Sequence, residues 1–82
     1  MKEHGTRRYL RWFEKIGDDY IADEDLIGLE LDELQSLFNV PIDNPMYDCW
    51  KVNEEHVLIL QKHVKHNITI EEYDYFVGAS SK

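Results

Sequence analysis

The chain has 82 residues and a net charge of −8, from seventeen Asp and Glu against nine Lys and Arg, and it holds five Tyr, three Phe and two Trp. A chain of this length forms one domain with a thin core, which leaves little room to enclose a substrate pocket. The negative charge argues against nucleic acid as a partner, because phosphates are repelled. An acidic surface that carries aromatic side chains instead suits the capture of a basic protein.

No apolar run approaches the roughly 20 residues that cross a membrane, and the first ten residues lack the apolar stretch of a signal peptide. The single cysteine, Cys49, excludes an intramolecular disulfide and agrees with a reducing compartment. We therefore expect a cytoplasmic protein with no membrane partner, which is a monomer or a weak dimer when free.

The segment from Arg8 to Glu14 is rich in residues that favour strands, and its side chains alternate between two faces. Leu10 and Trp12 share the face that we expect to be buried. The opposite face carries Tyr9, Arg11 and Phe13. A turn follows over Ile16 to Asp19, and Tyr20 and Ile21 begin a returning strand. Residues 22–30 show no clear period, so this second strand depends partly on the resemblance described below.

Two helices are predicted. The apolar spacing of Leu31, Leu34, Leu37 and Phe38 indicates a short amphipathic helix over Leu31 to Phe38, and Pro41 and Pro45 mark the loop after it. Asn53 is a suitable N-cap for a second helix that runs to about Lys65. The buried positions expected for this second helix are Val57, Leu60 and Val64.

A third strand is predicted near Asp48 to Val52, and a last strand over Tyr73 to Val77. In the last strand, Tyr75 and Val77 face inward, so Asp74 and Phe76 face outward. The whole chain forms one domain over residues 1–82, and we expect residues 1–6 and 79–82 to fray. If helices cover one face of the sheet, the outward aromatics and acids share its open face.

Several residues are of types that occur in catalytic or metal-binding sites, but the sequence pattern around each of them is weak evidence for such a site. His56, His63 and His66 have no adjacent cysteine and no His-Glu-x-x-His pattern, so we expect no metal and no cofactor. The pairs Asp18/Asp19 and Glu71/Glu72 are typical of solvated turns. Cys49 lacks the signature of a nucleophile, and the chain is therefore not expected to be an enzyme.

Six short motifs occur in a characteristic order and spacing. They are Trp12–Lys15, Val40–Pro41 followed by Asp43–Asn44, Cys49–Val52, Leu58–Gln61, Ile68–Ile70 and Tyr75–Val77. This series resembles the cloacin and ribonuclease-colicin immunity proteins, in which the motifs read WFDK, VP followed by DN, CFDV, LLQ, IDI and EYFV. The resemblance extends from about Tyr9 to Val77, which is most of the chain.

The resemblance implies an α+β fold: a small antiparallel sheet of about four strands with one or two short helices packed on one face. It also implies a protein that binds a basic cytotoxic nuclease beside its active site. The implied toxin-binding positions, with the acidic residues that support them, are Phe13, Asp19, Tyr20, Asp23, Glu24, Cys49, Asp74 and Phe76.

The chain departs from the family pattern at Arg7, Arg8 and Arg11, and at Pro45 to Tyr47, so the toxin itself stays open. We expect an immunity protein against a nuclease toxin of a bacteriocin or of a contact-dependent system. The alternatives are a small acidic adaptor or regulatory module that binds another protein through the same sheet and, more remotely, a hydrolase.

Overall fold

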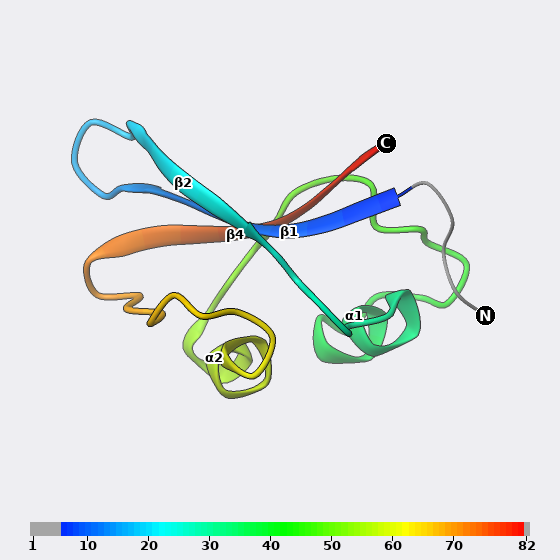
Figure 1. The fold of residues 1–82 in the computed structure, drawn as a ribbon. Coiled ribbons are helices and arrows are strands. Elements are labelled where there is room, and N and C mark those ends of the chain that lie inside the picture. Colours follow the sequence, from blue (N-terminus) through cyan, green and yellow to red (C-terminus); the bar gives the residue numbers. More distant parts are fainter. Residues whose placement is uncertain (1–5, 82) are drawn as a thin grey trace.

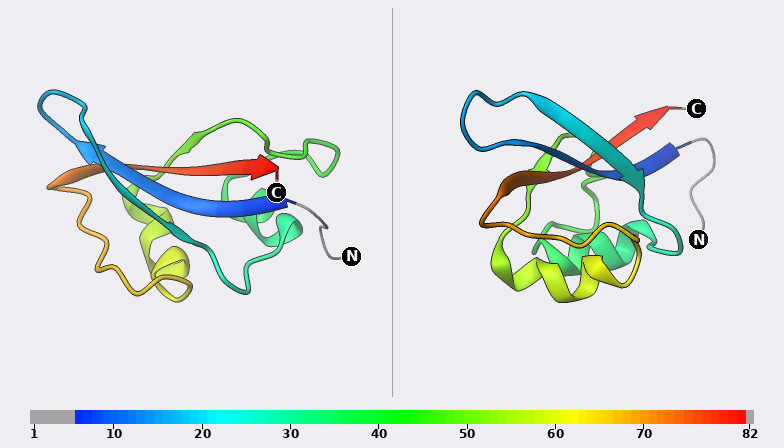
Figure 2. Two further views of the ribbon diagram at one scale, coloured as in Figure 1. Left: turned by 45° about the horizontal axis from the view of Figure 1, so that its top comes forward. Right: turned by 60° about the vertical axis from the view of Figure 1, so that its left-hand side comes forward.

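The structure, a computed structural model, describes residues 6–81 and has a four-stranded sheet with two helices. The elements in chain order are β1 (Thr6–Glu14), β2 (Tyr20–Asp25), α1 (Leu31–Leu37), β3 (Trp50–Lys51), α2 (Glu54–Gln61) and β4 (Tyr73–Ser81). The sheet is antiparallel with strand order β2-β1-β4-β3. Both helices lie on the same side of the sheet (Figure 1), and the two further directions in Figure 2 show the same arrangement. The predicted α+β fold is confirmed.

The two central strands place their side chains as the alternation predicted. Leu10 and Trp12 of β1 are 0% and 6% exposed, and they pack with Tyr75 and Val77 of β4 in the core under the helices. Phe13 lies on the other face and is half-buried. The face without helices is called the open face below. No helix in residues 6–81 is long and apolar enough to cross a membrane.

The β1–β2 hairpin contains an irregularity that reorients its end. Phe13 pairs with Tyr20 and Trp12 pairs with Ala22, so Ile21 is an extra residue in β2. Such a bulge bends the strand and increases its twist. In the turn, Gly17 has a φ of 93°, a conformation that glycine adopts without steric cost.

Strand β4 is longer than predicted. It continues to Ser81, which pairs with Thr6, so the expected fraying of residues 6 and 79–81 is wrong. The extension forms because β1 also begins early and offers a partner along its full length. Residues 1–5 and 82, which were also expected to fray, lie outside the described residues.

Helix α1 agrees with its prediction to within one residue, whereas α2 ends at Gln61 instead of about Lys65. Tertiary hydrogen bonds explain the early end of α2. The carboxylate of Glu24 accepts hydrogen bonds from the backbone N–H groups of Lys65, at 2.7 Å, and His66, at 3.1 Å. The chain leaves the helix, and the His66 ring stacks on Trp12 with 4.0 Å between ring centroids.

Of the predicted third strand, Trp50 and Lys51 pair with β4, and the backbone N–H of Val52 donates to the carbonyl of Tyr75 at 2.9 Å. The preceding loop is held by two buried polar side chains instead. Arg8 is 6% exposed and donates hydrogen bonds to the carbonyls of Met46, at 2.6 Å, and Pro45, at 2.8 Å. Gln35 donates to the carbonyl of Asn44 at 2.6 Å. These bonds satisfy the loop carbonyls without a strand partner.

Candidate protein-binding site

A row of aromatic side chains crosses the open face from strand to strand. Phe13 of β1 lies edge to face with Tyr20 of β2, at 6.1 Å between centroids, and with Phe76 of β4, at 5.8 Å. Edge-to-face contacts at these distances are favourable arrangements of aromatic rings. The row forms because the register pairs Phe13 with Tyr20 and sets Phe76 beside it on the neighbouring strand. These three residues are called the aromatic row below.

A shallow hollow of about 460 Å³ lies beside the aromatic row. The residues that line it are Tyr9, Arg11, Phe13, Asp18, Cys49, Asp74 and Phe76. Cys49 is exposed and comes directly before β3, so it closes the side of the hollow opposite β2. This set is called the open-face hollow below.

Tyr9 lies on the open face and is nevertheless only 6% exposed. The guanidinium groups of Arg7 and Arg11 lie 4.8 and 4.5 Å from the centre of its ring. On the neighbouring strand, Tyr9 pairs with Gly78, and the ring lies over this glycine. Tyr9 is therefore a fixed part of the floor of the open face.

The charges of the open face are largely paired with one another. Arg7 bonds both Asp23, at 2.8 Å, and Asp25, while Arg11 approaches Asp23 at 3.4 Å. The hydrogen bond from Arg7 lowers the pKa of the Asp23 carboxyl group, and the Tyr20 hydroxyl adds a further bond at 3.0 Å.

A second cluster of paired charges borders the hollow. Asp74 accepts hydrogen bonds from Lys15 at 2.9 Å and from Lys51 at 3.3 Å. The bond from Lys15, followed by that from Lys51, lowers the pKa of Asp74. The acidic residues expected on the open face do lie there, but their charge is balanced by cationic residues of β1, of β3 and of the turn after β1, and this pairing was not expected.

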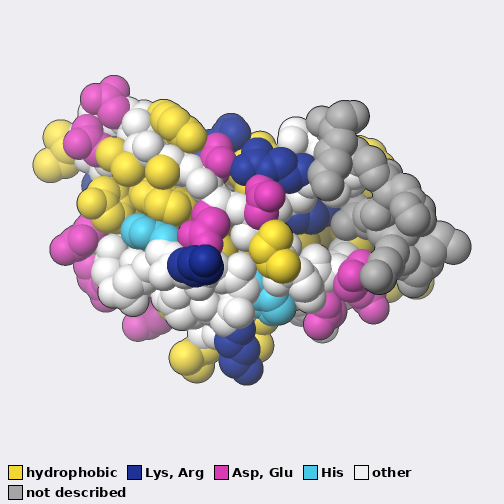
Figure 3. All heavy atoms as spheres, viewed as in Figure 1, with side chains coloured by type: hydrophobic (Ala, Val, Ile, Leu, Met, Phe, Trp, Pro, Cys, Tyr) yellow, Lys and Arg dark blue, Asp and Glu magenta, His cyan; other side chains and the backbone are white. Residues whose placement is uncertain are grey.

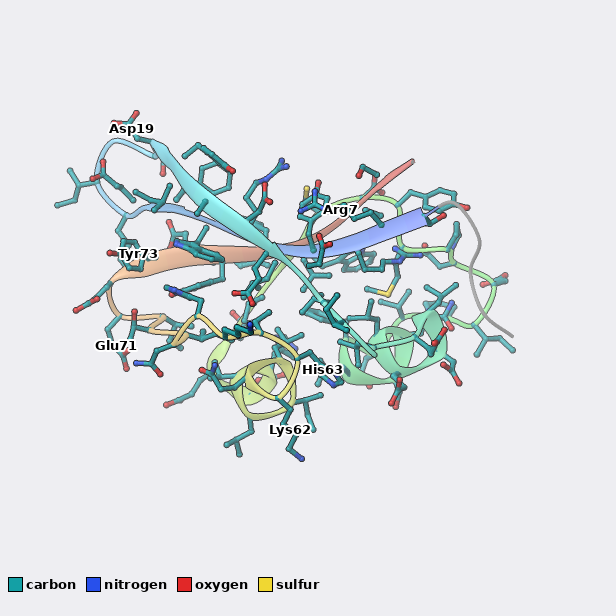
Figure 4. All side chains as sticks on the ribbon, viewed as in Figure 1. Arg7, Asp19, Lys62, His63, Glu71 and Tyr73 are labelled. Carbon is teal, nitrogen blue, oxygen red and sulfur yellow. The ribbon has the colours of Figure 1, made fainter. Side chains whose placement is uncertain are left out.

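The excess of negative charge lies elsewhere, and one concentration is at the end of the sheet that carries the β1–β2 turn. Figure 3 shows acidic side chains gathered at this end, on the left of the view. Figure 4 places Asp19 and Glu71 there, on two different turns. The exposed acidic residues here are Glu14, which ends β1, and Asp18, Asp19, Glu71 and Glu72, which follow in the two connections. They are called the acidic end below.

The structure brings most of the predicted site residues together. Phe13, Cys49, Asp74 and Phe76 line the open-face hollow, and Tyr20 extends the aromatic row. Of the predicted acidic residues, Asp23 lies beside Tyr20 on the same face, and Asp19 belongs to the acidic end.

Glu24 does not join this surface, because it pairs with Leu10 in the β1–β2 register and therefore faces the helices. There its carboxylate caps the backbone that follows α2. Three lining residues were not predicted as contacts: Tyr9, Arg11 and Asp18. The strand alternation places Tyr9 and Arg11 on the open face, and this pattern was sufficient to predict them, whereas Asp18 was predicted only as a residue of a solvated turn.

Each of the three histidines near α2 has a packing role. His56 accepts a hydrogen bond from the backbone N–H of Asn53 at 2.9 Å, and its ring stacks on Phe38. His63 lies 2.8 Å from the carbonyl oxygen of Ile27, and His66 lies 2.7 Å from the Tyr75 hydroxyl. Within residues 6–81, no group of three or more His, Cys, Asp or Glu side chains is arranged to hold a metal ion.

The fold is that of a small α+β domain, which carries an aromatic row and a hollow on the open face of its sheet. The chain belongs to the family described as a domain of unknown function, DUF7683, whose sequence profile matches residues 7–78. That range includes both helices and the whole aromatic row. A comparison with curated proteins gave no match.

Proposed function

We propose that this chain is a cytoplasmic, non-enzymatic immunity protein, which binds and inhibits the basic nuclease domain of a bacteriocin or contact-dependent toxin. One observation carries the proposal. Four positions that the resemblance assigns to toxin contact, Phe13, Tyr20, Cys49 and Phe76, are far apart in sequence and form one continuous surface. Their convergence on the open face is what a shared binding role requires.

The mechanism follows from how charge and apolar area are distributed. The acidic end attracts a cationic domain over several ångströms and accelerates association. The aromatic row then provides apolar contacts that slow dissociation, since buried aromatic side chains dominate the binding energy of such interfaces. A partner bound in this way is inhibited by occlusion and by the repulsion of its nucleic acid substrate from the acidic end.

An acidic adaptor is the second candidate function, and one feature favours it. A separate groove of about 400 Å³ lies on the helical side of the molecule, with Leu29, Leu37 and Ile59 in its lining and Asp32 and Glu33 beside them. An adaptor needs two binding surfaces, whereas an immunity protein needs only the open face.

Cell protection by paired variants tests the proposal. The chain is co-expressed with each basic nuclease domain encoded next to its gene, and cell growth and complex formation are measured. We expect the wild-type chain to protect and Phe13→Ala to reduce protection, while Leu58→Ala, at an 80% exposed helical position, protects fully. A wild-type chain that forms no complex with any of these nuclease domains and gives no protection would favour the adaptor.

Cys49 provides a finer test of the same surface. Cys49→Ser keeps a similar volume and is expected to protect, because the proposal assigns no thiol chemistry to this residue. Cys49→Trp places a bulky ring at the edge of the open-face hollow and is expected to weaken binding by steric overlap. A folded serine variant that fails to protect would contradict the proposed role of Cys49.

A further inference from the structure

We infer that the open-face hollow binds an uncharged aromatic side chain of the partner, and that the partner's lysine and arginine residues contact the acidic end instead. The inference rests on the proposed function for the identity of the partner. The preference of the hollow itself depends only on the residues around it. Three features of these residues support the inference.

The first feature is the apolar lining. The rings of Tyr9, Phe13 and Phe76 form much of the surface of the hollow. Its volume of about 460 Å³ is within the range of roughly 300–1,000 Å³ that small-ligand pockets occupy. Phe13 and Phe76 are half-buried, so each still has ring surface to offer a partner. A third ring can extend the edge-to-face arrangement that these two already adopt.

The second feature is that cations of the chain itself already lie over the rings. The Lys51 ammonium lies 5.2 Å from the centre of the Phe76 ring. Arg11 lies 4.5 Å from the Tyr9 ring and 5.7 Å from the Tyr20 ring. An aromatic site that attracts a cation needs a free ring face within about 6 Å. Here an incoming lysine or arginine would be repelled by the positive charges of Lys51 and Arg11.

The third feature is that two carboxylates near the hollow, Asp74 and Asp23, are already engaged in ion pairs. Asp74 is held by Lys15 and Lys51, and the neighbouring Asp23 is held by Arg7 and Arg11. A cation that entered the hollow would have to compete with these ion pairs. Asp18 is the lining carboxylate with no hydrogen bond or ion pair within residues 6–81, and it belongs to the turn at the acidic end. Its position directs a partner's cation to that end.

The net charge of −8 therefore does not describe the place where the partner inserts. The acidic end is exposed and suited to long-range attraction, whereas the open-face hollow is charge-balanced and suited to apolar contact. Charged residues at an interface act mainly on the association rate, and desolvated aromatic anchors act mainly on the dissociation rate. Substitutions at the acidic end should therefore change mainly the association rate, and substitutions in the open-face hollow should change mainly the dissociation rate.

The first experiment needs no partner. Amide chemical shifts of the full chain are recorded by NMR while N-acetyl-tyrosine amide, which is neutral, or N-acetyl-lysine amide, which is cationic, is added. We expect the tyrosine amide to shift the amide signals of Phe13, Cys49 and Phe76 at least threefold more than the lysine amide does. The Phe76→Ala variant should lose this response, and the Leu58→Ala variant should keep it. Equal or larger shifts with the lysine amide, or no shifts with either probe, would overturn the inference.

The second experiment uses the sign of one substitution. Lys51→Met removes a cation from the edge of the hollow and frees part of Asp74. If the hollow receives a lysine or arginine, this variant should bind the toxin domain at least about fivefold more tightly than wild type. If the hollow receives an aromatic ring, Lys51→Met should bind the toxin domain within twofold of wild type or more weakly. The control is Lys62→Met, at an exposed residue just beyond α2, and it should also bind within twofold of wild type or more weakly. Tighter binding by Lys51→Met alone would overturn the inference. If no basic nuclease binds the wild-type chain, the proposed function fails, and the NMR result still decides the preference of the hollow.

Discussion

Adjacent residues of β1 lie on opposite faces of the sheet, so the stability of the fold and the proposed binding can be tested separately. Trp12 is 6% exposed and stacks on His66, whereas its neighbour Phe13 is half-buried in the aromatic row. Because consecutive side chains of a strand point to opposite faces, the two positions report on different surfaces.

We predict that Phe13→Ala weakens toxin binding by about 2 kcal/mol and that Trp12→Ala lowers the free energy of unfolding by about 3–5 kcal/mol. Phe76→Ala should behave like Phe13→Ala. Urea denaturation gives the stability of each variant, and calorimetric titration with the toxin domain gives its affinity. A stable Trp12→Ala variant together with an unfolded Phe13→Ala variant would show that the faces are inverted.

Gly78 is required by the close approach of Tyr9. A Cβ atom at this position would lie 2.7 Å from the Tyr9 hydroxyl oxygen and 2.8 Å from two carbons of its ring. The ring cannot easily move, because it is 6% exposed and lies against Arg7 and Arg11.

We therefore predict that Gly78→Ala lowers the free energy of unfolding by about 1–3 kcal/mol, as overpacking does. The matched control is the same substitution in a Tyr9→Ala background, where the clash is absent and the cost should largely disappear. Chemical denaturation of the wild type, Gly78→Ala, Tyr9→Ala and the double variant gives the free energies of unfolding for this double-mutant cycle. Equal costs in both backgrounds would show that the tyrosine ring is not the cause.

At the level of the element, the start of α2 depends on a neutral histidine. The backbone N–H of Asn53, the N-cap residue, donates a hydrogen bond to Nδ1 of His56, which must be unprotonated to accept it. Burial lowers the pKa of His56 below its ordinary value of 6.5. The folded state consequently binds this proton less readily than the unfolded state does.

The sign of the pH dependence follows. Between the lowered pKa and 6.5 the unfolded state binds more protons, so stability rises with pH across this interval. The contribution of His56 is fully present above pH 6.5 and is lost as the pH falls toward the lowered value. We predict that the wild-type chain loses stability between pH 7.5 and 5.5 in thermal or urea unfolding.

His56→Gln is the matched control, because glutamine at this position of a helix can accept the same backbone hydrogen bond and does not titrate. The variant should show a flatter pH profile over the same range. An unchanged profile in the variant would assign the pH dependence to other groups.

At the level of the whole molecule, opposite charges are arranged so that the open face is balanced and the acidic end is not. Salt screens interactions between exposed charges, and the screening length falls from about 10 Å at 0.1 M to about 3 Å at 1 M. The association rate of the toxin complex should therefore fall strongly between about 20 and 500 mM salt, while its dissociation rate changes little.

The variant Glu71→Gln/Glu72→Gln should associate more slowly at low salt and should show a weaker salt dependence, with dissociation unchanged. Asp32→Asn/Glu33→Gln removes the same charge from the first turn of α1 and is the control for net charge, because glutamine can keep the hydrogen bond that Glu33 accepts from the Glu30 N–H. Stopped-flow or surface-binding kinetics measure both rates. A wild-type association rate that stays constant with salt would contradict steering by the acidic end.

The sequence by itself determined the features that depend on near neighbours in the chain. The period of two in β1 and β4 correctly assigned Trp12 to the core and Phe13 to the open face, because strand alternation is a local property of the backbone. The apolar spacing of α1 located that helix to within one residue for a similar reason. The predicted sheet with helices on one face was confirmed as well.

Only the tertiary structure decided which charges cancel and where each element ends. Lys15 and Asp74 are 59 residues apart in sequence and pair because β1 and β4 are neighbours in the sheet. Glu24 ends α2 from a strand 41 residues earlier, and it thereby leaves the surface on which it was predicted to lie. Such pairs depend on the register and order of the strands, which local patterns do not specify. The sequence therefore determined the net charge of the chain, and the packing of distant strands determined that the centre of its open face is charge-balanced.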